Sequence, residues 1–288
     1  MKLKRQKFII IICLFLFAFC VMAKSKWPSV IKIGVIPIEG GTANVNHRFG
    51  PMAEHLERKL GIKVKLITAT DYAGIITAMA HDHIDFSYLG AKTYIEAKNR
   101  AGAEIIVKEI NERGFHGYRG IIITRADSGI LKLENAKGKT FAFIDPNSTS
   151  GYLVPYIRFK RAHPQINPQK FFKKVMFSGS HPASILSVKN GSVDLAATND
   201  VDLDRMALAG KVNKKEFRIL WTSEIIPGGA VVGRKSLPES LKRAFGEAMI
   251  KMNASIQKHM QNSGFRWGKD EEYDVVRYLI KLKKDMGK

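Results

Sequence analysis

Short apolar runs alternate with longer amphipathic segments through the first third of the chain. Strands are predicted at residues 31–36, 64–67 and 84–89, and helices at residues 49–60 and 72–80. Pro51 near the start of the first helix and Gly61 just past its end are typical boundary residues. The polar residues 39–44 before that helix predict a loop. Because strands and helices alternate, the pattern predicts an α/β sheet with parallel strands.

A unit of helix, tight turn and buried strand occurs twice. Residues 74–79 and 84–86 form one copy, residues 184–188 and 193–195 form the other, and each strand has one Asp at its second position. Two such units predict two lobes. We expect lobe 1 at residues 24–118 plus 222–288, and lobe 2 at residues 119–221. Further strands are predicted at residues 121–124, 141–144, 218–221 and 230–232, and two Lys-rich amphipathic helices from residue 239 onward.

The first 23 residues have the pattern of a secretory signal peptide. Four basic residues precede an apolar run at residues 8–22, which is shorter than the roughly 20 residues that a membrane-spanning helix needs. The run ends at Ala23, and this order of segments is typical of a cleavable signal. Cys20 follows Phe19, whereas a small residue normally precedes a lipid-modified cysteine. We therefore expect cleavage after Ala23 and a periplasmic product that is not membrane-anchored.

Composition and charge exclude several classes of site and partner. With 45% hydrophobic and 25% charged residues among 288, the chain has enough apolar material for a packed core. Cys13 and Cys20 are its only cysteines, so cleavage excludes disulfides, thiol catalysis and cysteine-bound zinc. The formal net charge falls from +21 to +17 without the four basic residues of the signal segment. This charge favours an anionic partner, and export excludes nucleic acid as that partner.

Residues 145–151, Asp-Pro-Asn-Ser-Thr-Ser-Gly, lie between a predicted strand and a predicted helix that starts near Tyr152. The hydroxyls of Ser148, Thr149 and Ser150 and the unpaired N–H groups of the helix start would point several donors at one place. The helix dipole favours an anion there without any charged residue. Ordinary capping by one hydroxyl is the alternative, and the spacing alone does not choose between the two.

Residues 145–155, Asp-Pro-Asn-Ser-Thr-Ser-Gly-Tyr-Leu-Val-Pro, resemble the ligand loop of the phosphate, phosphite and phosphonate type of periplasmic substrate-binding proteins of ABC transporters. Similar segments occur in the family's order at residues 71–74, 88–97, 117–118, 178–181, 221–228 and 264–277. The resemblance implies a two-lobed α/β clamp, type II-like, with the ligand cleft between the lobes. It also implies that a monomer without cofactor or metal binds a small phosphorus oxyanion (phosphonate, phosphite or phosphate) and delivers it to an ABC permease.

The resemblance further implies roles for seven side chains. Ser148, Thr149 and Ser150 match donors to the phosphonate oxygens, and His181 matches a histidine at a second helix start. Two tyrosines from the opposite lobe and the crossover are matched by Tyr72 and Tyr118. The seventh residue is Asp200, a carboxylate that could meet an amine.

Two positions depart from the family members that bind aminoethylphosphonate. Those members have carboxylates where an ungapped match places Val201 and Gly229. We therefore expect phosphate, phosphite or methylphosphonate to bind more tightly than aminoethylphosphonate, unless Asp200 or Asp202 reaches the amine. The sequence does not choose among the three favoured oxyanions.

Other candidate sites have simpler explanations. Residues 81–85 include two His and two Asp, a metal-like composition, but they fall in a turn that is predicted to be a solvated surface. His47 and Arg48 could add positive charge near the cleft mouth or form an exposed basic pair.

A hydrolase triad of Ser148 or Ser150 with His181 and Asp200 is disfavoured. A nucleophile elbow needs Gly two residues before the Ser, and those positions hold Pro146 and Ser148. We therefore expect a binding protein rather than an enzyme. The alternative is a sensory ligand-binding subunit for a membrane kinase or chemoreceptor, which would use the same fold and pocket.

Overall fold

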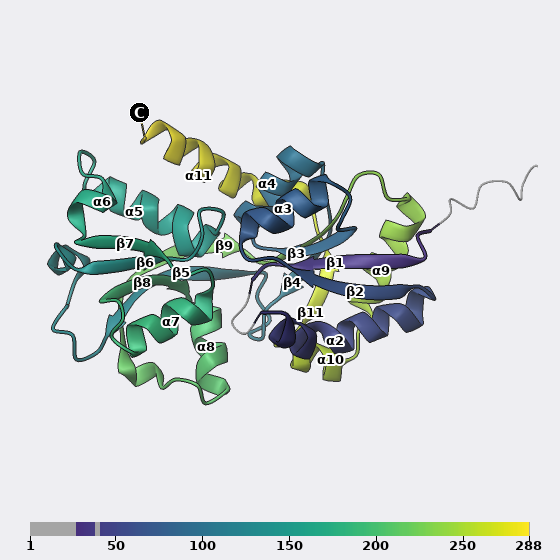
Figure 1. The fold of residues 1–288 in the computed structure, drawn as a ribbon, viewed down its shortest axis with the longest axis horizontal. Helices are drawn as coiled ribbons and strands as arrows, with labels where there is room; N and C mark the ends of the chain where they lie inside the picture. Colours follow the sequence, from purple (N-terminus) through teal and green to yellow (C-terminus); the bar gives the residue numbers. More distant parts are fainter. Residues whose placement is uncertain (1–26, 38–40, 288) are drawn as a thin grey trace, which may run out of the picture.

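The computed structural model describes residues 27–37 and 41–287, which form two α/β lobes side by side (Figure 1). The predicted signal peptide and its cleavage site lie outside the described residues. Each lobe contains one sheet with helices on both faces, as the two-unit pattern predicts. No helix within the described ranges is long and apolar enough to cross a bilayer.

Lobe 1 contains a six-stranded sheet of order β11-β4-β10-β3-β1-β2. Its strands are β1 (Val30–Val35), β2 (Lys63–Thr68), β3 (Phe86–Leu89), β4 (Glu104–Ile110), β10 (Ala230–Gly233) and β11 (Gly264–Trp267). Its helices are α2 (Gly41–Leu60), α3 (Tyr72–Ala80), α4 (Ala91–Ala101), α9 (Glu239–Ile250) and α10 (Ala254–Met260). β1 is parallel to β2 and β3, whereas β10 and β11 run antiparallel to their neighbours. The sheet is therefore mixed, and only its N-terminal part has the predicted parallel arrangement.

Lobe 2 contains a five-stranded sheet of order β7-β6-β8-β5-β9. Its strands are β5 (Gly117–Arg125), β6 (Thr140–Phe143), β7 (Lys174–Phe177), β8 (Leu195–Asn199) and β9 (Phe217–Pro227). Its helical segments are η1 (Leu133–Ala136), η2 (Thr149–Leu153), α5 (Val154–Ala162), α6 (Pro168–Phe171), α7 (His181–Lys189), α8 (Asp200–Leu208) and η3 (Lys214–Glu216). The chain passes between the sheets at the β4–β5 and β9–β10 connections, so the predicted boundaries at 118/119 and 221/222 fall inside β5 and β9.

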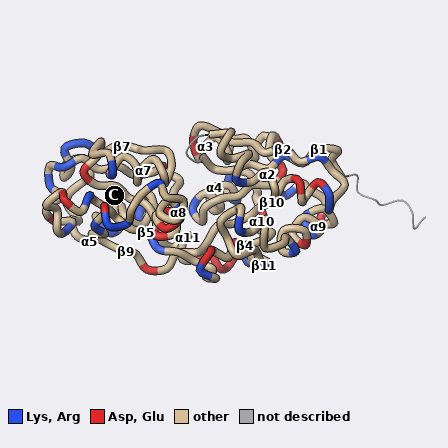
Figure 2. The backbone as a smooth tube through the Cα atoms, turned by 90° about the horizontal axis from the view of Figure 1, so that it is seen from below, with Lys and Arg blue, Asp and Glu red and all other residues tan. Residues whose placement is uncertain are grey.

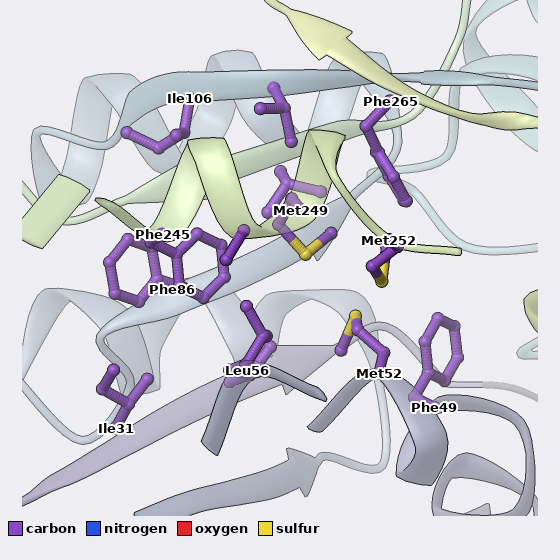
Figure 3. Packing of buried hydrophobic residues seen from close by; sticks show 14 of the residues in the cluster. Ile31, Phe49, Met52, Leu56, Phe86, Ile106, Phe245, Met249, Met252 and Phe265 are labelled. Carbon is purple, nitrogen blue, oxygen red and sulfur yellow. The ribbon is translucent and has the colours of Figure 1, made fainter. Parts of the chain in front are cut away.

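The main core of lobe 1 lies between the sheet and helices α2 and α9 (Figure 3). Phe86 of β3 and Phe245 of α9 stack with ring centroids 3.8 Å apart. Leu56 of α2 and Met249 of α9 are fully buried in the same cluster. Each of these helices contributes one apolar face, which is why apolar residues recur at helical spacing in both segments.

A second core cluster joins the two lobes. After η4 (Asp270–Tyr273), the C-terminal helix α11 (Asp274–Asp285) extends from α4 of lobe 1 toward α5 of lobe 2 (Figure 1). Val276 of α11 is fully buried in one cluster with Tyr94 of α4, Leu153 of η2 and Ile157 of α5. The lobes are therefore joined on this side by apolar packing as well as by the two chain crossings.

The prediction for α2 was wrong at its N-terminus. The helix begins at Gly41, so Pro51 lies inside it and part of the predicted loop is helical. Proline has no N–H to donate to the carbonyl four residues earlier, and that carbonyl belongs to His47. His259 Nε2 donates to His47 O instead, at 2.6 Å, which satisfies the freed acceptor.

The C-terminal segment also differs from the prediction of two helices. The strand β11 lies between α10 and α11 and pairs with β4 at the edge of the sheet. A four-residue strand has too few residues to give a clear alternation of apolar and polar positions.

Candidate ligand-binding site

A cavity of about 100 Å3 lies between the lobes and adjoins a larger outer chamber of about 450 Å3. Both lobes and the connections between them line the inner cavity. The residues that line both spaces are Ile36, Tyr72, Tyr88, His181, Asp202 and Arg205. The two spaces therefore share one wall.

The loop predicted to bind an anion lies at the inner cavity. Ser148 is the N-cap of the π-helical turn η2, and its Oγ accepts from Gly151 N at 3.0 Å. A Cβ at position 151 would stand 2.0 Å from Ile144 Cγ1, so only glycine fits this close approach. Ser148 and Thr149 line the cavity. The segment thus combines a cap with a set of cavity-facing hydroxyls.

Ser148 and Thr149 each retain a hydroxyl hydrogen for a ligand. The oxygen of Ser148 accepts from Gly151 N, and Thr149 Oγ1 accepts from Lys92 N at 2.8 Å. A hydroxyl that accepts one bond can still donate its own hydrogen. Ser150 differs, because it is fully buried, is not among the lining residues, and has an Oγ without a partner among the described residues.

The same loop contacts two helix starts of lobe 1. Thr149 Oγ1 accepts from Lys92 N in the first turn of α4. It replaces the side-chain cap that the N-cap residue of this helix, Gly90, cannot provide. Asp145 Oδ2 accepts from Tyr72 N at the start of α3, at 3.3 Å. Gly90, Tyr72 and His181 of α7 all line the cavity, so three helix N-termini surround it. Their dipoles favour an anion in this space.

Tyr72 and Tyr118 both line the inner cavity, as the family resemblance implies. Tyr72 comes from α3 of lobe 1, and Tyr118 comes from β5 beside the crossover. Burial raises the pKa of Tyr118 to about 12 and the pKa of Tyr72 well above its ordinary value. Both phenols therefore stay protonated at neutral pH and can donate hydrogen bonds to an anion.

His181 begins α7 and is held in one tautomer. Its Nδ1 lies 3.0 Å from Thr198 Oγ1 and 3.1 Å from Asn199 Nδ2. Asn199 Oδ1 accepts from Asp202 N as the N-cap of α8, so its NH2 group is the side that faces the ring. Nδ1 must then accept, which assigns the proton to Nε2. Burial lowers the pKa of His181 despite the opposing effect of Asp202, so the ring offers a neutral Nε2–H donor.

Asp200 does not line either chamber. Its carboxylate accepts from Arg119 N at 2.9 Å and pairs with Arg113 Nη1 at 2.8 Å. Asp202, two residues further along α8, lines both chambers. Successive helical residues are rotated by about 100°, so two residues apart lie on nearly opposite sides of the helix. Val201 and Gly229 also line the inner cavity.

The sequence reasoning missed Glu109 and Arg205. Both line the inner cavity, and Arg205 Nη2 lies 3.2 Å from Glu109 Oε1. They are 96 positions apart and come from different lobes, so no local motif joins them. The available signal was a carboxylate within the apolar segment 104–110, Glu-Ile-Ile-Val-Lys-Glu-Ile. A charge in a buried strand is rare unless it is paired.

The remaining candidates from the sequence (the turn at residues 81–85, the pair His47 and Arg48, and the hydrolase triad) do not form a second site. Asp85 accepts from Lys32 N at 2.8 Å and pairs with Arg234, which are structural contacts within lobe 1. Within the described ranges, no group of three or more His, Cys, Asp or Glu residues could hold a metal ion. His47 and Arg48 line the outer chamber. The neighbours of His181 Nδ1 are Thr198 and Asn199, and Asp200 points elsewhere, so the considered triad is not assembled.

Comparison with known proteins gives one consistent family. The sequence profile described as "ABC transporter, phosphonate, periplasmic substrate-binding protein" matches residues 33–273. The phosphonates-binding periplasmic protein of Escherichia coli K12 is 34% identical over 267 residues, which cover 89% of this chain and 78% of that protein.

Two solved structures agree in fold. A binding-protein component of an ABC phosphonate transporter from Pseudomonas aeruginosa superposes with a TM-score of 0.84 at 32% identity, covering 91% of this chain and 88% of that one. PhnD1 from Prochlorococcus marinus, in complex with methylphosphonate, gives a TM-score of 0.80 at 20% identity, covering 89% and 99%.

Proposed function

This chain belongs to the phosphonate-binding family of periplasmic substrate-binding proteins of ABC transporters, and from that membership we propose that it captures a small phosphorus oxyanion between its lobes. Family members are binding proteins rather than enzymes. Because they serve ABC transporters, delivery to a permease is favoured over the sensory role that the sequence left open. The observation that carries the proposal is the convergence of neutral donors and helix starts on one small cavity.

The cavity suits a compact ion. Its volume is about 100 Å3, and one water molecule needs on the order of 10–15 Å3 of such space. Phosphate, phosphite or a phosphonate with a short substituent is of this size. Hydroxyl and imidazole donors can hold such an oxyanion through hydrogen bonds to its charged oxygens, which are stronger than bonds between neutral groups.

We further propose that binding is completed by closure of the two lobes. In this proposal, residues 24–118 plus 222–288 move against residues 119–221 around the crossings at β5 and β9. Closure removes water from the cavity and strengthens each hydrogen bond to the anion. Tyr72 on one side and Ser148, Thr149 and His181 on the other would then contact one ligand. The Oγ of Ser150, which has no partner among the described residues, is the further donor that we propose for it.

The proposed location is the periplasm, with the mature chain as a soluble monomer that begins at Lys24. The signal-like residues 1–23 and the family support this location. Intact-mass spectrometry of the exported protein should give the mass of residues 24–288 without a lipid. A diacylglycerol adduct on Cys20 would contradict the proposal.

The test of the ligand class is isothermal titration with phosphate, phosphite and methylphosphonate, and with sulfate for comparison. We expect at least one phosphorus oxyanion to bind, and Ser148→Ala to weaken it by about ten- to a hundred-fold, because a hydrogen bond to a charged ligand contributes about 1.5–3 kcal/mol. Ser178→Ala is the matched control, because its hydroxyl bonds only within lobe 2 and does not line the cavity. Equal affinities in both variants would place the anion elsewhere.

A further inference from the structure

The inner cavity has an acidic side as well as an anion-binding side. Glu109 of β4 in lobe 1 and Asp202 of α8 in lobe 2 both line it, and Glu109 is 8% exposed. A Cβ at Gly229 would stand 3.1 Å from the Tyr88 hydroxyl and 3.2 Å from Glu109 Oε2. The missing side chain at position 229 therefore leaves room for the Glu109 carboxylate. The cavity thus contains two carboxylates even though positions 201 and 229 supply none.

Arg205 occupies the space between these carboxylates. Its guanidinium lies 3.2 Å from Glu109 Oε1 and 3.5 Å from Asp202 Oδ1. It is also 2.7 Å from Glu112 Oε1 and donates to Gln261 O at 2.6 Å. The side chain is 10% exposed and lines both chambers. A cation of the protein is therefore already bound where the cavity is most acidic.

The surrounding charges hold this arrangement in its ionised form. Burial disfavours the charge on Arg205, but Glu109 and Asp202 outweigh it and keep its pKa above the usual value. Burial also opposes ionisation of Asp202, but the Arg205 guanidinium and the hydrogen bond from Asn199 Nδ2 outweigh it and keep the pKa of this carboxyl below its usual range. Arg48 lines the outer chamber and forms no ion pair with the described carboxylates. The arginine that pairs with Glu109 and Asp202 is therefore Arg205.

We propose that Arg205 is the specificity-determining residue of this cleft: its guanidinium takes the place of a ligand ammonium, so the protein selects phosphorus oxyanions whose substituent is uncharged. The proposal rests on the proposed function and specifies its ligand class.

The physical reason is the cost of an unpaired buried charge. An ammonium group that enters the cavity loses its hydration and needs a carboxylate in return. Glu109 and Asp202 are the acidic residues at the inner cavity among the described ones, and both already contact Arg205. The ligand ammonium would have to displace the Arg205 guanidinium from these carboxylates. Otherwise it would share them with the guanidinium, and the two positive charges would repel each other at close range. An uncharged substituent leaves the network intact.

The test uses two ligands of nearly equal shape. Propylphosphonate and 2-aminoethylphosphonate differ at the end of the substituent, where a methyl group replaces an ammonium group. Their Kd values are measured by calorimetry on the same protein, at one pH and one salt concentration. The ratio of the two affinities cancels any general loss of stability or of phosphonate binding. Methylphosphonate serves as the reference for the proposed function itself.

We expect the wild-type protein to bind propylphosphonate at least about ten-fold more tightly than aminoethylphosphonate, a difference of about 1.4 kcal/mol. Arg205→Met removes the charge and keeps an aliphatic side chain, and it should shift the ratio toward the amine by at least about ten-fold. Arg205→Lys should keep the wild-type preference. In the double variant Arg205→Met with Glu109→Gln, the affinity gained for aminoethylphosphonate should be lost, because the carboxylate that would pair with the ammonium is removed.

Arg113→Met is the matched control, because Arg113 also pairs with two carboxylates of α8, Asp200 and Asp204, but does not line the cavity. It should leave the ratio unchanged. A wild-type preference for the amine would overturn the proposal, as would an unchanged ratio in Arg205→Met. If none of phosphate, phosphite and methylphosphonate binds the wild-type protein, the proposed function fails instead. The wild-type ratio can still contradict the proposal if Arg205→Met does not fold, because a preference for the amine would overturn it.

Discussion

Every donor that we propose for the anion is neutral. The hydroxyls of Ser148, Thr149, Tyr72 and Tyr118 carry no charge, and the His181 ring is neutral because burial lowers its pKa. A neutral site binds an anion through directed hydrogen bonds, which depend on placement more than on salt concentration. The charged side chains lie instead on the acidic side, where they compensate one another.

The state of His181 gives a prediction about pH. Its folded-state pKa lies below the ordinary value of 6.5, so above pH 6.5 this residue is mainly neutral in both the folded and the unfolded state. As the pH falls below 6.5, the unfolded state binds the proton first and the folded state loses stability. At pH 7.5, His181→Gln should lower the free energy of unfolding by about 1–3 kcal/mol, because Thr198 and Asn199 lose their hydrogen bonds to Nδ1.

The measurement is urea denaturation of the ligand-free wild type and variant between pH 7.5 and 5.5. The stability difference between the two proteins should shrink as the pH falls, since only the wild type loses the contribution of His181. Groups common to both proteins cancel in this difference. A difference that stays constant or grows would show that His181 is not held neutral.

Site residues could be predicted from the sequence where they are neighbours in the chain. Ser148 and Thr149 are adjacent residues in one turn, so their motif is visible in the chain itself. Glu109 and Arg205 come together only when two lobes fold against each other. The placement of Asp200 and Asp202 depends on the rotation of α8, which composition does not reveal.

Among the elements, the turn η2 connects the ligand loop to the core shared by the lobes. Thr149 begins this turn at the cavity, and Leu153 ends it as a fully buried residue packed in the cluster with Val276 of α11. Packing at one end of the turn therefore positions the hydroxyls at the other end.

This connection predicts a difference between two leucine variants. Leu153→Ala and Leu133→Ala should each cost about 2–5 kcal/mol of unfolding free energy, because both side chains are buried. Only Leu153→Ala should also weaken ligand binding, by at least about three-fold, or roughly 0.6 kcal/mol. Leu133 belongs to the separate core of lobe 2 and serves as the control. Equal ligand affinities in the two variants would contradict the role of this turn.

Element boundaries were predictable where a local signal exists. The prediction of a helix at residues 72–80 is confirmed, because Asp71 caps it by accepting from Gly74 N at 2.7 Å. The start of α2 was wrong because Pro51 suggested a boundary, whereas a long-range bond from His259 makes the proline acceptable within the helix. Such compensation from another segment is not visible locally.

For the whole molecule, the repeated unit predicted the two-lobed α/β architecture. The antiparallel strands escaped that prediction because β5, β9 and β10 adjoin the crossings, where the chain returns rather than continuing the repeat. Positive charge is denser in lobe 2: residues 119–221 contain 17 Lys and Arg against 8 Asp and Glu, a net +9 over 103 residues, whereas the other 162 residues of the expected mature chain have a net +8. Figure 2 shows blue segments gathered around β7 and α5 of lobe 2. This excess of positive charge attracts anions toward the protein before they reach the cleft.

The position of β10 in the lobe 1 sheet has a consequence for the order in which the two sheets can be completed. β10 lies between β3 and β4 and pairs with both, yet the whole of lobe 2 separates it from β4 along the chain. Until β10 joins the sheet, the facing edges of β3 and β4 have no partner, and unpaired strand edges are prone to aggregation. The strands of lobe 2 are contiguous in the chain and can assemble earlier. The sheet of lobe 1, although its strands begin first, can therefore be completed only after the chain of lobe 2.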